Sequence, residues 1–247
     1  MTHTWKITAK DIKLVRQVCE EQKNHKIFIR RQKINVETKS LNISKEVFWK
    51  CIFTCLLTTQ QRSSEDSRIN EFLKSGYSKI GLTKLSRQKN IKKYIASQLK
   101  GFGGIRRTKL IPIEAETIYK YLIQSEWNLL KRVNNFSKEK GNKYRERELA
   151  NEIVEEKGFK GLGPKQSRNL LQMLGYSIYE IPIDSRITDW LNANNIFPFK
   201  LNSKGLSDIE FYCFLNDAII ELCEKAGVKP CMFDAAVFSS KENRVRS

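Results

Sequence analysis

The chain reads KGFKGLGPKQSRNLL over residues 157–171, and helical patterns flank its glycines. This stretch predicts a helix, a tight hairpin and a second helix that begins near Lys165. The glycines permit backbone conformations that other residues disfavour, and they let main-chain N–H groups approach a ligand closely. Because N–H groups at a helix N-terminus bind anions, we interpret the hairpin as a site for DNA backbone phosphates. A glycine turn that only ends a helix is the simpler alternative, and the flanking lysines count against it. The residues expected to contact DNA here are Lys160, Gly161, Gly163 and Arg168.

Lys165 lies in the first turn of the second predicted helix. An ammonium group there meets the positive end of the helix dipole and has Lys160 and Arg168 as neighbours, so its pKa should fall. A neutral lysine amine is a nucleophile that can form a Schiff base with an electrophilic sugar carbon. On position alone, a role as one more phosphate-pairing cation would be the commoner one.

Asp184 follows the apolar, proline-stiffened run Ile181-Pro182-Ile183 and precedes another helical pattern. We expect its carboxylate to cap the N-terminus of that helix. A capping aspartate is held rigidly and kept ionised. Such a carboxylate beside a sugar could stabilise an oxocarbenium-like transition state.

The run Gly161-Leu162-Gly163-Pro164-Lys165, followed by Ile183-Asp184, resembles the helix-hairpin-helix DNA glycosylase superfamily. The resemblance implies that Lys165 is the nucleophile and Asp184 its catalytic partner. Upstream, LLTTQQRS at residues 56–63 is similar to the helix end whose glutamine fills the gap left by a flipped base. Gln60 is the better match to that glutamine, and Gln61 remains possible.

Within the superfamily, the sequences at 166–171 and 183–187 are most similar to the prokaryotic, archaeal-type 8-oxoguanine glycosylases. The endonuclease III branch differs, because Asp184 is followed here by Ser185-Arg186 and the iron–sulfur cysteines of that branch are missing. The resemblance implies a bifunctional DNA glycosylase and abasic-site lyase of base excision repair, acting on 8-oxoguanine. The alternatives are the same chemistry on another modified base, for example a modified cytosine in foreign DNA, and a non-catalytic DNA-binding module.

The composition is strongly basic. The 247 residues include 45 Lys+Arg against 27 Asp+Glu, a formal charge of +18. This surplus favours a polyanionic partner, and double-stranded DNA with a damaged base fits the motifs.

The N-terminus has no apolar signal region, and the longest apolar run, around residues 51–57, is too short to span a membrane. We therefore expect a soluble, cytoplasmic and nucleoid-associated protein that acts as a monomer. The six cysteines match no disulfide framework or zinc spacing, so we expect neither a metal nor another cofactor.

The hydrophobic periodicity predicts an all-α fold with two helical lobes that flank a DNA-binding cleft. One lobe should comprise residues 44–175, and the other residues 1–43 with 176–247. Residues 26–31 contain β-branched and aromatic side chains, which indicates a short strand that would belong to an N-terminal strand pair. For the pocket of the extruded base, the candidates are Phe233 and Trp49, although aromatic residues at helical spacing more often belong to a core. Helices are expected at about 10–22, 45–58, 64–74, 83–86, 88–99, 113–124, 145–157, 165–174, 184–193 and 207–226.

Overall fold

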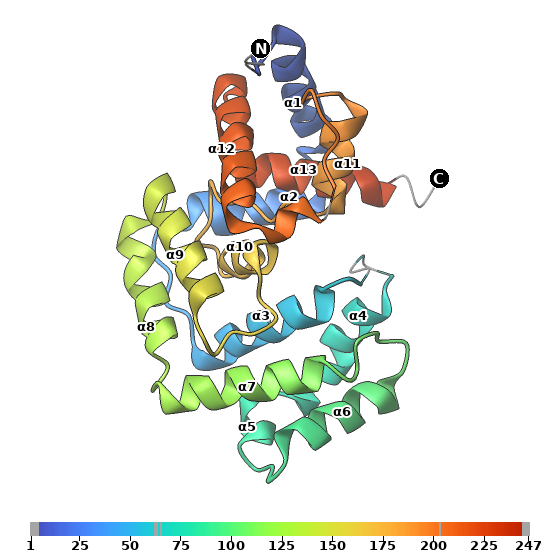
Figure 1. The fold of residues 1–247 in the computed structure, drawn as a ribbon, viewed down its shortest axis with the longest axis vertical. Coiled ribbons are helices and arrows are strands. Elements are labelled where there is room, and N and C mark those ends of the chain that lie inside the picture. Colours follow the sequence, from blue (N-terminus) through green and yellow to red (C-terminus); the bar gives the residue numbers. More distant parts are fainter. Residues whose placement is uncertain (1–4, 62–63, 65, 203, 244–247) are drawn as a thin grey trace.

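The computed structural model describes residues 5–61, 64, 66–202 and 204–243. Over these residues the chain is helical and contains no strand, as the sequence predicted (Figure 1). None of the described helices is long and apolar enough to cross a membrane. The α-helices are α1 (Ala9–Gln22), α2 (Lys26–Arg31), α3 (Lys45–Thr58), α4 (Arg68–Glu71), α5 (Leu82–Leu85), α6 (Ile91–Phe102), α7 (Ile111–Gln124), α8 (Asn128–Asn135), α9 (Lys143–Glu155), α10 (Pro164–Met173), α11 (Ser185–Ala193), α12 (Ile209–Ala226) and α13 (Pro230–Asn243).

The predicted strand at residues 26–31 is wrong, because these residues form α2. His25 caps this helix by accepting the N–H of Ile27, and the chain continues into a π-helical segment, Gln32–Glu37. Strand propensity reflects packing on a pleated surface, and no described strand is present to pair with this segment. Packing against α13 instead places Phe28 beside the core.

The first hydrophobic core is built around α3, which crosses the middle of the lower half of the molecule (Figure 1). Ser44 begins α3 by accepting the N–H of Val47. The helix packs against α7 and α10, and seven of its apolar side chains are fully buried. Val47 departs from its apolar neighbours, because 45% of it is exposed. The buried seven are Phe48, Trp49, Ile52, Phe53, Cys55, Leu56 and Leu57.

The second core joins the beginning of the described chain to its end. Helix α1 packs on α12 and α13, and α11 packs on α13. A capping box begins α1, in which Thr8 and Asp11 each bond the other's backbone N–H. The first core draws on residues between 48 and 176, and the second on residues 15–19 and 181–237. The lobe boundaries at 44 and 176 stay a prediction.

Candidate active site

The hairpin before α10 is anchored by the side chains between its glycines. Phe159 and Leu162 are each 2% exposed and belong to the first core. Gly161 has φ +94°, and a Cβ there would lie 2.7 Å from the carboxyl carbon of Glu114. Gly163 differs, because a Cβ there would meet nothing within 4 Å. The fold therefore requires glycine at position 161 and leaves the surface at Gly163 open.

Lys165 is half-buried in the first turn of α10. Burial lowers the pKa of its amine, the nearby cation Arg186 lowers it further, and the Asp184 carboxylate opposes both. The predicted fall in pKa is confirmed, although its cause differs from the expected one. Arg186 is the neighbouring cation that lowers this pKa, whereas Lys160 and Arg168 were the neighbours expected from the sequence.

Asp184 is the N-cap of α11, as predicted. One carboxylate oxygen accepts the N–H groups of Arg186, at 2.9 Å, and Ile187, at 3.3 Å. The other oxygen accepts the Nε of Arg186 at 2.8 Å. Burial raises the pKa of this carboxyl, but Arg186, Lys165 and the Ile187 N–H outweigh burial and hold the pKa below its usual value. Asp184 is therefore an ionised group whose charge acts on the Lys165 amine.

Two further charged groups adjoin this pair, and the sequence analysis assigned neither of them a role beside Lys165 and Asp184. The Arg186 guanidinium lies over the Phe238 ring, 3.8 Å from its centroid. Asp234 on α13 is 6% exposed and lies 3.5 Å from Arg31. Burial raises the pKa of Asp234 to about 6, Arg31 opposes this rise and Asp184 adds to it. The four-residue spacing of Asp234 and Phe238, which places both on one face of a helix, was the available signal.

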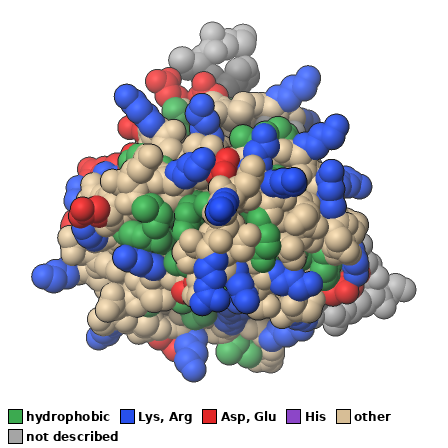
Figure 2. Space-filling model, turned by 90° about the horizontal axis from the view of Figure 1, so that it is seen from below, with side chains coloured by type: hydrophobic (Ala, Val, Ile, Leu, Met, Phe, Trp, Pro, Cys, Tyr) green, Lys and Arg blue, Asp and Glu red, His purple; other side chains and the backbone are tan. Residues whose placement is uncertain are grey.

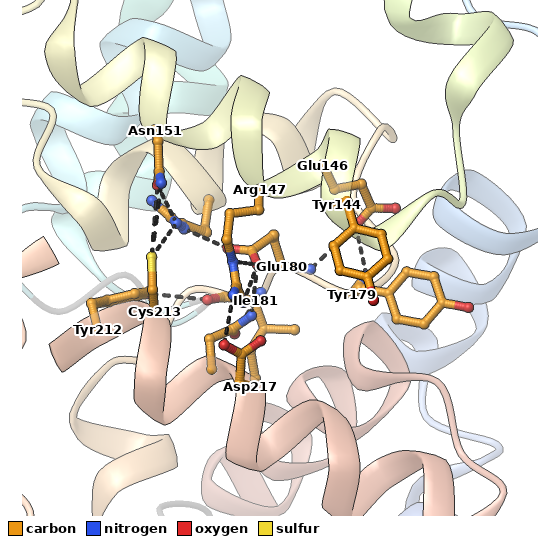
Figure 3. Close-up of polar contacts among 12 residues, drawn as sticks. Tyr144, Glu146, Arg147, Asn151, Tyr179, Glu180, Ile181, Tyr212, Cys213 and Asp217 are labelled. Carbon is orange, nitrogen blue, oxygen red and sulfur yellow. Dashed lines mark hydrogen bonds and ion pairs between the residues drawn. The ribbon is translucent and has the colours of Figure 1, made fainter. Parts of the chain in front are cut away.

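Arg168 does not face DNA, which corrects the sequence prediction. Its side chain is fully buried and donates from Nε to Glu180 Oε2 at 2.8 Å. A second nitrogen donates to Asn151 Oδ1 at 2.6 Å. Glu180 also accepts from Arg147, so its carboxylate lies between two guanidinium groups (Figure 3). A cation paired in this way inside the protein is not available to a phosphate.

The two glutamines after α3 differ in their contacts. Gln61 donates to the Leu57 carbonyl at 2.8 Å and accepts the Arg106 N–H at 2.6 Å, so its amide holds two parts of the protein together. Gln60 is exposed and has a left-handed backbone, with φ 56°. This difference supports Gln60 as the candidate for filling the gap in DNA. Arg62 and Ser63, the end of the matched motif, lie outside the described residues.

Neither aromatic candidate for the base pocket is accessible, so both predictions are wrong. Trp49 is fully buried in the first core, where its indole N–H donates to the Ile80 carbonyl at 3.0 Å. Phe233 is fully buried in the second core, and its ring lies 5.0 Å from that of Trp190. Both rings face core residues because they lie on the inner sides of their helices.

The described residues contain no group of His, Cys, Asp or Glu that could hold a metal ion. All six cysteines are free thiols. Cys55 is close enough to Lys165 for the two groups to interact electrostatically. Burial raises the pKa of the Cys55 thiol. A buried thiol of this kind stays protonated and packs as a small apolar group.

Over the described residues the chain is helical, and a hairpin precedes the lysine-bearing helix α10; this fold is similar to that of solved 8-oxoguanine DNA glycosylases, as the resemblance implied. Three solved structures match nearly the whole chain. The 8-oxoguanine DNA glycosylase of Methanocaldococcus jannaschii is 22% identical, covers 94% of this chain and 95% of its own, and gives a TM-score of 0.65.

A second structure is the 8-oxoguanine glycosylase/lyase of the same organism in complex with a 15mer DNA containing 8-oxoguanine. It is 19% identical, covers 93% of this chain and 98% of its own, and has a TM-score of 0.66. The 8-oxoguanine DNA glycosylase of Thermotoga maritima is 16% identical, covers 92% of this chain and 93% of its own, and has a TM-score of 0.62. No protein-family profile and no curated protein matches the chain. At these identities the likeness shows the fold.

Proposed function

We propose that this chain is a DNA glycosylase with abasic-site lyase activity, and that 8-oxoguanine is the base it excises. The observation that carries the proposal is the pair formed by Lys165, whose amine has a lowered pKa, and Asp184, whose carboxylate is kept ionised. Lys165 lies at the junction of the hairpin with α10 and Asp184 at the start of α11, in a fold shared with 8-oxoguanine glycosylases. Lowered lysine and carboxylate pKa values at one site are typical of nucleophilic catalysis.

The chemistry follows from the two side chains. The lone pair of the Lys165 amine attacks C1′ of the extruded nucleotide, and the bond from C1′ to the base breaks with its electrons on the base, which takes up a proton. The Asp184 carboxylate stabilises the positive charge that develops on the sugar. Ring opening then breaks the C1′–O4′ bond, protonates O4′ and leaves a Schiff base. Loss of a C2′ proton breaks the C3′–O bond and cleaves the strand.

The hairpin and Gln60 are proposed to hold the DNA. The N–H groups around Gly161 and Gly163 lie at the surface with Lys160 exposed beside them. Because nothing in the protein lies near the missing Cβ of Gly163, its bare backbone leaves space for an external group such as a phosphate. Gln60 would enter the space vacated by the flipped base, whose extrusion costs roughly a few kcal/mol.

Borohydride trapping on duplexes that contain 8-oxoguanine or an abasic site tests the proposal. The wild-type chain should form a covalent adduct with both, and Lys165→Gln should form none. An undiminished adduct in Lys165→Gln would disprove the assignment of the nucleophile. A panel of duplexes with other oxidised purines and modified cytosines tests the substrate, and faster release of one of those bases would replace 8-oxoguanine. Binding without an adduct would support the non-catalytic alternative.

A further inference from the structure

A long segment of the chain that contributes to the first core contains no acidic residue. Between Glu71 and Glu114 the sequence contains eleven lysines and arginines and no Asp or Glu. Five of these cations, Lys84, Arg87, Lys89, Lys92 and Lys93, are exposed and lie close together in the sequence around the start of α6. Figure 2 shows Lys and Arg side chains spread over this side of the molecule. We call these five residues the basic face.

The cations of the basic face do not serve the stability of the fold. Within the described part of the chain, none of the five forms an ion pair with a carboxylate. Lys92 and Lys93 lie in the first turn of α6, after the N-cap Asn90. The helix dipole disfavours positive charge at that end and favours Asp or Glu, and Glu116 of α7 supplies such a carboxylate by accepting the Lys92 N–H at 3.4 Å. The two lysine charges themselves are unfavourable for the helix dipole, which points to an interaction outside the chain.

The basic face lies away from the candidate active site. Helix α6 connects the face to the loop where the Arg106 N–H meets Gln61, and its 12 residues span about 18 Å. Figure 1 places α5 and the start of α6 at the end of the molecule opposite α11 and α13. A duplex segment held at Lys165 is therefore not the one expected to contact these cations.

We propose that the basic face is a second DNA-binding surface, which holds backbone phosphates of duplex outside the lesion-containing segment. The proposal rests on the proposed function only in taking DNA as the partner. Two carboxylates lie beside the five exposed cations, Glu46 at the start of α5 and Glu116 at the start of α6. The remaining surplus of positive charge matches a phosphate backbone, and nothing in the face requires a particular base sequence.

Salt-dependent binding to lesion-free duplexes tests this surface. The variant with Lys89→Ala, Lys92→Ala and Lys93→Ala should bind a duplex of about 40 base pairs with a log–log salt slope that is shallower by about 2.7, or 0.9 for each lost phosphate contact. Its binding to a duplex of about 12 base pairs, roughly 40 Å long, should be unchanged. The matched control is Lys6→Ala, Lys10→Ala and Lys13→Ala, which removes the same charge near α1 and should leave both slopes unchanged.

Equal slopes for the two triple variants on the long duplex would overturn the proposal, and so would an equal loss on the short duplex. Because this readout uses lesion-free DNA, it is independent of the chemistry at Lys165. Failure of borohydride trapping in the wild-type chain would sink the proposed function and leave this binding result intact.

The hydrogen bonds of Tyr212 support a second inference, which is independent of the basic face. Tyr212 on α12 is fully buried, and its hydroxyl bonds the backbone on both sides of Pro182. It accepts the Ile183 N–H at 2.6 Å and donates to the Ile181 carbonyl at 2.9 Å. These bonds fix the main chain immediately before Asp184.

The same tyrosine also contacts the helix that carries Lys165. Its ring centroid lies 5.1 Å from the guanidinium carbon of Arg168, which is three residues after Lys165 on α10. Arg168 in turn pairs with Glu180, in the segment that leads to Asp184. Tyr212 therefore lies between the backbones that present the two proposed catalytic groups.

We propose that Tyr212 is a positioning residue, which sets the place of Asp184 relative to Lys165 and so rests on the proposed function. Tyr212→Phe should keep the ring and lose both hydroxyl bonds. Because Asp184 raises the pKa of Lys165, a displaced Asp184 should lower that pKa further. The pH dependence of Lys165 acetylation by acetic anhydride, followed by mass spectrometry, measures this directly and needs no DNA.

Tyr176→Phe is the matched control, because Tyr176 is equally buried and its hydroxyl also bonds the main chain, at the Leu41 carbonyl. The acetylation midpoint should move to lower pH in Tyr212→Phe and stay in place in Tyr176→Phe. Pro182→Ala loosens the same backbone and should move the midpoint in the same direction, which keeps the test open if Tyr212→Phe does not fold. An unmoved midpoint in a folded Tyr212→Phe, or in Pro182→Ala, would overturn the role.

Discussion

Asp184 joins a structural task and a chemical task in one carboxylate. Asparagine caps a helix about as well as aspartate, so Asp184→Asn should keep the cap and lose the charge beside Lys165. We expect base release to fall by about 10²- to 10³-fold, with DNA affinity retained. Single-turnover excision and fluorescence-anisotropy binding measure the two effects. Lost binding with unchanged excision would show that the carboxylate acts only as a cap.

Arg168 is the residue whose role the structure changed most. Arg168→Met removes one partner of a fully buried ion pair and should lower the free energy of unfolding by about 3–5 kcal/mol. The control Arg145→Met removes an exposed arginine that also pairs with carboxylates, and it should leave the free energy of unfolding almost unchanged. Urea denaturation measures both variants. A small cost for Arg168→Met with a shallower salt slope for DNA binding would restore the phosphate role.

The catalytic pair was predictable because each residue carries a local signal. Asp184 follows a proline and begins a helix, and Lys165 follows a glycine hairpin. The buried position of Arg168 was not predictable, because a charged residue three positions after Lys165 on the same helix can face either solvent or the core. Its partner Glu180 lies in a loop whose position only the tertiary structure defines. The effect of Asp234 on Asp184 was not predictable for the same reason, because α13 reaches this site only through its packing on α11. Arg186 differs, since it contacts Asp184 locally, two residues along the chain.

At the scale of elements, the two exposed hairpin glycines should respond oppositely to alanine. In Gly161→Ala the alanine would have to adopt a left-handed φ, and its Cβ would clash with the Glu114 carboxyl. The substitution should therefore lower the free energy of unfolding by about 1–3 kcal/mol. Gly163 has φ −75° and open space, so Gly163→Ala should raise the free energy of unfolding slightly, by up to about 1 kcal/mol. Thermal denaturation measures both. In the Gly163→Ala variant DNA affinity should fall for every sequence, and unchanged affinity would contradict the phosphate contact.

Most helices were predictable from periodicity, and two of the three exceptions, α2 and α13, share a cause. Helices α8 and α13 were not predicted, and α2 was predicted as a strand. Helix α13 is buried on nearly all sides, so its apolar residues show no 3.6-residue period, and α2 is too short for a period to be recognised. In both cases packing between elements decides the conformation.

At the scale of the whole molecule, Glu146 couples stability to pH. Its buried carboxylate on α9 accepts the N–H groups of residues 178–180, in the connection between the two cores. Burial raises its pKa to about 7 although these N–H groups favour the ionised form. The folded chain therefore holds this proton more tightly than the unfolded chain, so this group's contribution to the free energy of unfolding falls as the pH rises from about 4.5 to about 7, by at most about 3 kcal/mol.

In Glu146→Gln the side chain is neutral in the folded and the unfolded chain, so the variant should lose the decrease in unfolding free energy that Glu146 causes between about pH 4.5 and pH 7. Urea denaturation at pH 5 and pH 8 measures it as the difference in unfolding free energy between wild type and variant. Glu155→Gln, an exposed glutamate on the same helix, is the control and should track the wild type. If the difference between wild type and Glu146→Gln is the same at both pH values, Glu146 does not titrate in this window.

The pairing of α1 with α12 and α13 has a consequence for synthesis on the ribosome. The residues of the first core emerge as one continuous stretch and can pack as soon as that stretch is complete. Helix α1 emerges well before its partners α12 and α13, so it must wait through about 200 residues of translation, or roughly 10–40 s at about 5–20 residues per second. During that interval its apolar side, with Val15 and Val18, is open to chaperones, and the second core closes only after α12 and α13 have been made.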